Sequence, residues 1–119
     1  MQNTCTVYRT ANFVSKRWTL PILLELYKEN SECKRYSHLK KKLVDITPKI
    51  LSSRLKELEK EGLITKKIDA KTYPIKCEYS LTPSGKDFIK IIKDIKKWAL
   101  RWNIKNKACE NSDCMNCKL

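Results

Sequence analysis

The sequence predicts a mainly α-helical fold with one small β-hairpin, which places the chain in the α+β class. The chain has 119 residues, a length that fits a single domain. Thr47 with Pro48, and Thr82 with Pro83, mark two helix starts, and each pair precedes apolar residues at helical spacing. Between the two predicted helices lie two short segments with the composition of strands. The chain therefore combines several helices with a single hairpin.

The N-terminal part of the chain predicts two helices, because its apolar residues recur at helical spacing. These residues are Val7, Ala11, Val14, Trp18, Ile22, Leu23, Leu26 and Tyr27. Pro21 is compatible with the second helix, because the first turn of a helix leaves its N–H groups without intrahelical partners. After a polar stretch, Ser37 is expected to cap a short helix that ends at Leu43.

The central helix is predicted from Thr47 to Glu61. Thr47 supplies a capping hydroxyl, and Pro48 suits the first helical position. The buried face is expected to consist of Leu51, Leu55 and Leu58. Gly62 follows at the position where a left-handed C-terminal cap is expected.

A hairpin and a long helix complete the predicted domain. Strands are expected at 63–68 and 75–81, joined by a turn with a basic tip. Thr82 and Pro83 then begin a helix that reaches about Asn103. Its apolar seam has coiled-coil spacing and consists of Phe88, Ile91, Ile95, Trp98 and Trp102, widened by Ile92 and Ala99. One protomer cannot easily use such a broad stripe, so part of it is expected to contact a second copy.

This order of elements predicts a winged helix-turn-helix. The helices at 37–43 and 47–61 form the helix-turn-helix pair, and the hairpin is the wing. The major groove of DNA, about 12 Å wide, accepts one helix, so 47–61 is the predicted reading helix. The domain is assigned to residues 5–104, and 105–119 form a short cysteine-containing C-terminal tail that is expected to be mobile.

The charge of the chain favours a polyanionic partner, and double-stranded DNA is the predicted one. Lysine and arginine number 26 against 13 aspartate and glutamate residues, which gives a net charge of +13. The longest apolar run, 20–24, is far shorter than the roughly 18 residues of a membrane-spanning helix. With no signal-peptide pattern, the chain is expected to be cytoplasmic and not to contact membranes. A single histidine and two glycines argue against an enzyme, because they support neither a phosphate-binding loop nor a Ser/His/Asp set.

The candidates for DNA contact lie on three elements: the reading helix, whose N-terminal end points into the groove, the helix before it, and the wing. They are Thr47, Lys49, Ser52, Ser53, Arg54 and Lys56, then Lys40 and Lys41, then Lys66, Lys67, Lys71, Tyr73 and Lys76. For Lys49 and Lys56, contact with phosphate is the alternative to base reading. For the lysines of the wing and of the preceding helix, solubility alone is the alternative.

The six cysteines are too few for a disulfide scaffold. Cys109, Cys114 and Cys117 have a spacing that suits zinc or, with a fourth ligand, an iron–sulfur cluster. Three ligands do not complete a site, so no cofactor is expected, and metal binding, thiol switching and an inert tail stay open. Cys5 is the predicted sensor, because Arg9 one helical turn later favours the thiolate. The alternative for Cys5 is a small apolar residue in a dimer interface.

Several motifs together resemble the HxlR-type transcriptional regulators, relatives of the MarR group. They are Cys5, residues 16–19, 46–51 and 55–58, Gly62 with Leu63, and residues 78–85. The resemblance implies a homodimeric winged-helix regulator whose N- and C-terminal helices form the dimer interface. It also implies that a small electrophile or oxidant acts through Cys5, since several members respond through a cysteine at that position. The expected interface residues are Val7, Ala11, Val14, Ile91, Ile95, Trp98 and Trp102.

The leading hypothesis is a sequence-specific DNA-binding transcriptional regulator that acts as a homodimer. Its operator is expected to be pseudopalindromic, with half-sites about 34 Å apart. Repression is favoured, because no segment suited to recruiting polymerase is evident. The alternatives are a non-specific DNA-coating protein and a thiol or iron–sulfur redox protein on a winged-helix scaffold.

Overall fold

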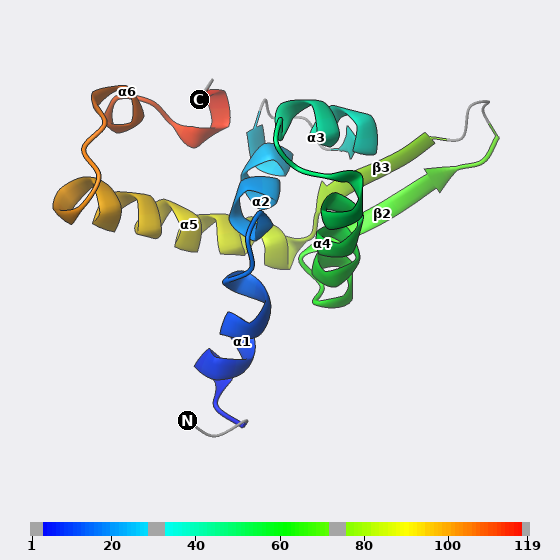
Figure 1. The fold of residues 1–119 in the computed structure, drawn as a ribbon, viewed down its shortest axis with the longest axis horizontal. Coiled ribbons are helices and arrows are strands. Elements are labelled where there is room, and N and C mark those ends of the chain that lie inside the picture. The colour runs from blue at the N-terminus through cyan, green and yellow to red at the C-terminus, as the bar shows by residue number, and fades with distance from the viewer. Residues whose placement is uncertain (1–3, 29–32, 72–75, 118–119) are drawn as a thin grey trace.

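The computed structural model describes residues 4–28, 33–71 and 76–117 (Figure 1). In chain order the elements are α1 (Thr6–Val14), α2 (Thr19–Tyr27), β1 (Lys34–Arg35), α3 (Tyr36–Lys42), α4 (Pro48–Lys60), β2 (Ile64–Asp69), β3 (Lys76–Leu81), α5 (Pro83–Trp102), α6 (Lys107–Glu110) and the 3-10 helix η2 (Cys114–Asn116). The fold is the predicted winged helix-turn-helix, in which α3 and α4 form the helix pair and β2 and β3 form the wing.

The capping signals of α4 and α5 are confirmed. The hydroxyl of Thr47 accepts a hydrogen bond from the backbone N–H of Ile50 at 3.2 Å, and that of Thr82 accepts one from Gly85 at 3.0 Å. Gly62 closes α4 with a φ of 84°, a left-handed conformation that glycine adopts without steric cost.

The predicted start of α3 is wrong. The helix begins at Tyr36, its N-cap residue is Arg35, and no side chain caps it, so Ser37 lies inside the first turn. The reason is β1, which pairs with β3 through Lys34 and Arg35. Because β1 ends at Arg35, α3 begins directly after it at Tyr36. A strand of two residues has no periodic pattern, so it could not be predicted from periodicity.

The sheet therefore has three antiparallel strands in the order β1-β3-β2. In the wing, Ile64 pairs with Leu81 and Lys66 with Tyr79. The core lies where this sheet meets α2, α4 and α5, and α2 crosses α5 near the middle of the molecule (Figure 1). Its most deeply buried apolar side chains are Ile22, Leu23, Leu39, Leu51, Leu55, Leu58 and Ile64.

The apolar stripe of α5, predicted as one seam, is divided between the core and the surface. Ile89 and Ile92 are buried at 2% and 5% exposure, whereas Trp98 and Trp102 are 58% and 68% exposed. Ile92 belongs to the part of the stripe that the core of the protomer uses, and the exposed tryptophans belong to the part that it leaves uncovered.

The tail, predicted to be mobile, contains two short helical segments. It forms α6 and η2 and turns back toward α2 (Figure 1). Lys96 Nζ donates to the carbonyl of Ser112 at 2.9 Å, and Lys93 Nζ lies 3.6 Å from the carboxylate of Asp113. These partners on α5 hold the polar tail in place. Among the described helices, none is long and apolar enough to cross a membrane.

Candidate nucleic-acid interface

Helix α4 presents one exposed polar face. Lys49, Ser53, Lys56 and Lys60 are all exposed, and they lie opposite the buried leucines of the same helix. Thr47, at the N-terminal end of this face, is exposed as well, although one lone pair of its hydroxyl caps the helix. Hydroxyl and ammonium groups along one face can donate to base edges and to phosphates.

The two serines of α4 differ in their surroundings. Ser52 is half-buried, and its hydroxyl donates to Tyr36 Oη at 3.4 Å, while Tyr36 donates to the carbonyl of Pro48 at 3.1 Å. Ser53 is exposed and has no such contact to α3. Ser52 therefore joins the two helices of the pair, and Ser53 remains on the surface.

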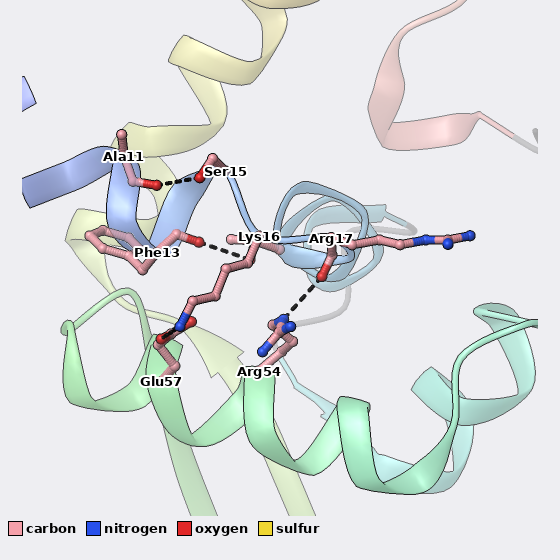
Figure 2. Close-up of polar contacts among 8 residues, drawn as sticks. Ala11, Phe13, Ser15, Lys16, Arg17, Arg54 and Glu57 are labelled. Atoms are coloured by element: carbon pink, nitrogen blue, oxygen red, sulfur yellow. Dashed lines mark hydrogen bonds and ion pairs between the residues drawn. The ribbon is translucent and has the colours of Figure 1, made fainter. Parts of the chain in front are cut away.

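Arg54 also turns away from the exposed face. Its side chain is half-buried, and its Nε donates to the carbonyl of Arg17 at 3.0 Å (Figure 2). Arg17 lies in the segment between α1 and α2, so this predicted DNA contact is at the same time a tertiary contact.

The wing and α3 add further cations. Lys66 and Lys67 on β2, Lys71 beyond it and Lys41 on α3 are exposed, and Lys40 is half-buried. Tyr73 and the side chain of Lys76 lie outside the described residues. The cations of α4 and β2 come together, because Lys56 and Lys66 line the same cleft of about 350 Å³.

Tyr79 and Cys77 also line this cleft. Burial raises the pKa of Tyr79 above its ordinary value of 10.0, and a hydrogen bond with Cys77 raises it further. The charged side chains that line this cleft between α4 and the wing are Lys56, Lys66 and the acidic Glu59.

Two apolar surfaces stand apart from this cationic region. On α1, Val7 is 70% exposed, Ala11 is exposed and Val14 is half-buried. On α5, the exposed side chains are Ile91, Ile95, Trp98 and Trp102. A monomer gains nothing by holding large apolar side chains in water, so both surfaces are suited to a protein contact.

A family model described as an HxlR-like helix-turn-helix matches residues 13–107. The chain belongs to the HxlR-like helix-turn-helix family. YvaP of Bacillus subtilis strain 168, a helix-turn-helix transcriptional regulator, is 36% identical over 94 residues, which cover 79% of this chain and 83% of YvaP. This HxlR-like protein is therefore a transcriptional regulator with a DNA-binding fold. MalR of Fusobacterium mortiferum, a regulatory protein, is 37% identical over 94 residues, which cover 79% of this chain and 86% of MalR.

Solved structures of related regulators agree with the fold. A MarR-family regulator from Porphyromonas gingivalis W83 has a TM-score of 0.74 at 32% identity, with 86% of this chain and 96% of that one covered. The oxidised form of the redox regulator HypR has a TM-score of 0.70 at 26% identity, with 82% and 96% covered. The HxlR-like chain is thus similar both to a MarR-type regulator and to a regulator that responds to redox state.

The cysteines of this HxlR-like protein carry thiols and form no disulfide among the described residues. Cys5 is half-buried at the N-cap of α1, where its side chain makes no capping bond. Cys109, Cys114 and Cys117 are half-buried in the tail, beyond the part that the family model matches. Within the described ranges, no group of three or more histidine, cysteine or acidic side chains is arranged to hold a metal ion.

Sequence reasoning missed two residues that connect elements of the domain. Tyr36 connects the helix pair through Ser52 and the carbonyl of Pro48. Lys34 is buried, and its Nζ donates to the carbonyls of Glu25 and Lys28 at the end of α2. Neither a tyrosine at the start of a short helix nor a lysine within a basic segment carries a sequence signal of these roles.

Proposed function

We propose that this HxlR-like regulator is a dimeric, sequence-specific repressor of the genes whose promoters it occupies. The observation that carries the proposal is the exposed polar face of α4 beside the lysines of the wing. Reading helix and wing would lie on the duplex together, with Lys49, Ser53 and Lys56 in the major groove and Lys66, Lys67 and Lys71 along the adjacent backbone. Thr47, Ser52, Arg54, Lys40, Lys41, Tyr73 and Lys76 remain the further candidates for DNA contact.

Pairing of two copies supplies the second half of the site. The exposed side chains of α1 and α5 have no cover within the described protomer, and burying them against a second copy removes apolar surface from water. The expected interface consists of Val7, Ala11, Val14, Ile91, Ile95, Trp98 and Trp102. A two-fold axis between the copies then predicts a pseudopalindromic operator.

The proposal includes a response to oxidants or electrophiles through Cys5. Similarity to HypR supports it, as does the position of Cys5 at the first turn of a helix that is expected to form the dimer. A modified thiol at this position changes the surface that the second copy meets.

The test begins with selection of bound fragments from the source genome, followed by footprinting. A regulator is expected to prefer its operator over random DNA by about a thousandfold or more at fixed salt. Equal affinity for both would instead indicate a non-specific DNA-coating protein, for which the charge of +13 is sufficient. Loss of transcription from the bound promoter on adding the protein, in a purified system, tests repression.

A further inference from the structure

The segment that joins α1 to α2 is a rigid corner. Lys16 N–H donates to the carbonyl of Phe13 at 3.4 Å, and the hydroxyl of Thr19 donates to the same oxygen at 3.1 Å. Trp18 ends the corner with a φ of 79°, a left-handed conformation that costs a residue with a Cβ about 1–2 kcal/mol. Such a conformation persists only where the surroundings hold it, so this segment is not a free hinge.

Two side chains of the reading helix α4 contact the corner. Arg54 Nε donates to the carbonyl of Arg17 at 3.0 Å, and Glu57, one helical turn further along α4, forms an ion pair with Lys16 (Figure 2). Figure 2 shows both α4 side chains pointing at the corner from the same face of the helix. Two contacts one turn apart restrict the angle between the corner and α4 more than a single contact does.

Helix α1 packs against the core through Phe13, in the last turn before the corner. It contains no buried residue, and in Figure 1 it projects from the body of the protein. An open cleft of about 470 Å³ is lined by Arg9, Asn12 and Phe13 of α1 and by Glu57 of α4. Solvent space lies between the rest of α1 and α4, so the direction of α1 relative to α4 is set by the corner and by the adjoining contact of Phe13 with the core.

We propose that Arg54 is a positioning residue that sets which half-site spacing the dimer accepts. The inference rests on the proposed function, in which α1 joins the dimer and α4 reads DNA. A rotation at the corner moves each reading helix relative to the two-fold axis. One base pair of spacing corresponds to about 3.4 Å along the duplex, so a small change of angle alters the preferred spacing. Arg54 therefore acts through the carbonyl of Arg17, and not by touching a base.

The experiment measures the affinity of the full chain for its selected operator and for duplexes whose spacer is one or two base pairs longer or shorter. Wild type is expected to lose about tenfold in affinity when the spacer changes by one base pair, and Arg54→Met to lose less than about threefold. Arg54→Lys keeps a donor for the Arg17 carbonyl and is expected to retain most of the preference. Lys86→Met, on the exposed side of α5, removes the same charge without touching the corner and is expected to keep it fully.

Salt dependence separates positioning from direct contact. If Arg54 only positions α4, Arg54→Met leaves the slope of log K against log salt unchanged. A slope reduced by about 0.9 for each lost phosphate contact, with the spacing preference intact, would show that Arg54 binds DNA and would overturn the inference.

Two further outcomes are distinguishable. A wild-type protein that does not distinguish operator from random DNA defeats the proposed function, and the inference with it. A specific wild type whose Arg54→Met variant keeps the full spacing preference defeats the inference alone. If Arg54→Met does not fold, Glu57→Gln removes the second contact of the corner. It is then expected to broaden the spacing preference, and an unchanged preference would equally reject the inference.

Discussion

The two glycines of the chain are needed at their positions for different structural reasons. Gly85 is buried in the first turn of α5, where a Cβ would overlap the carbonyl oxygen of Leu63. Gly62 has open space around it but a φ of +84°. One glycine is required by packing and the other by backbone conformation.

Substitution of each glycine by alanine separates these reasons. Gly85→Ala is expected to lower the free energy of unfolding by about 1–3 kcal/mol or more, because backbone must move to admit the methyl group. Gly62→Ala is expected to cost about 1–2 kcal/mol, and Gly62→Asn less, because asparagine tolerates the left-handed region. Urea denaturation measures both, and wild-type stability in Gly85→Ala would contradict the close approach to Leu63.

The serines of the reading helix are also expected to differ in effect. Ser53→Ala is expected to weaken operator binding about three- to tenfold and to leave random-DNA binding unchanged, because an exposed hydroxyl is lost from the reading face. Ser52→Ala breaks the bond to Tyr36 and is expected to lower stability by about 0.5–1.5 kcal/mol. Gel-shift titration and thermal unfolding separate the effects. Equal losses of Ser53→Ala on operator and random DNA would contradict the assignment of the reading face.

At the scale of elements, one face of α5 packs in the core and another face is exposed for the proposed contact with a second copy. Ile89 and Ile92 pack in the core, while Ile95 and Trp98 are 43% and 58% exposed. A charge on the exposed face is therefore compatible with the fold of the protomer, whereas it opposes an apolar contact between copies.

Trp98→Glu is expected to weaken dimerisation about a hundredfold or more, the range of an interface hot spot, and to leave the protomer folded. Sedimentation equilibrium at micromolar concentration gives the association state, and circular dichroism gives the helix content. Lys90→Glu is the matched control, because Lys90 lies on the same helix with its side chain 80% exposed. A Trp98→Glu protein that stays dimeric would show that the copies pair elsewhere.

The contact between the tail and α5 is expected to respond to acid. The backbone N–H of Met115 and the ammonium of Lys93 lower the pKa of Asp113 below its ordinary value of 3.8. The stabilisation is thus present above pH 3.8, and it is lost as the pH falls through the lower pKa of the folded state. The amide resonance of Met115 reports this titration by NMR.

Lys93→Met is expected to move the midpoint of that titration upward without restoring the ordinary value, because the Met115 hydrogen bond remains. An Asp113 midpoint at or above 3.8 in wild type would contradict the docked tail.

At the scale of the whole molecule, the expected sensor and the reading helices lie in different parts of the fold. Cys5 begins α1, and α1 reaches α4 through the corner at 15–18. A change at the expected dimer surface of α1 is therefore connected to α4 through a single short segment of the chain.

Cys5→Ser is expected to abolish the loss of operator binding caused by diamide or a maleimide, while binding in reducing buffer stays at the wild-type level. Fluorescence anisotropy with and without the reagent measures the response. A variant in which Cys109, Cys114 and Cys117 are all serine is the control and is expected to respond as wild type does. A response retained in Cys5→Ser and lost in the control would transfer sensing to the tail.

The local elements were largely predictable because their signals are local. A threonine and a proline at a helix start, a glycine at its end and leucines at helical spacing determine α4 within a stretch of sequence. The hairpin and the start of α5 follow from the same kind of signal. From their order came the winged helix-turn-helix and the position of the reading helix.

The remaining features depend on residues far apart in the chain. Ile92 joins a core built from residues of several elements, and lysines of α5 contact the tail. Arg54 is a cationic residue on the predicted reading helix, so the sequence suggests a DNA contact. Only the fold brings the carbonyl of Arg17 within hydrogen-bond distance of it. Periodicity identifies an apolar or cationic face, but tertiary packing decides which neighbour that face meets.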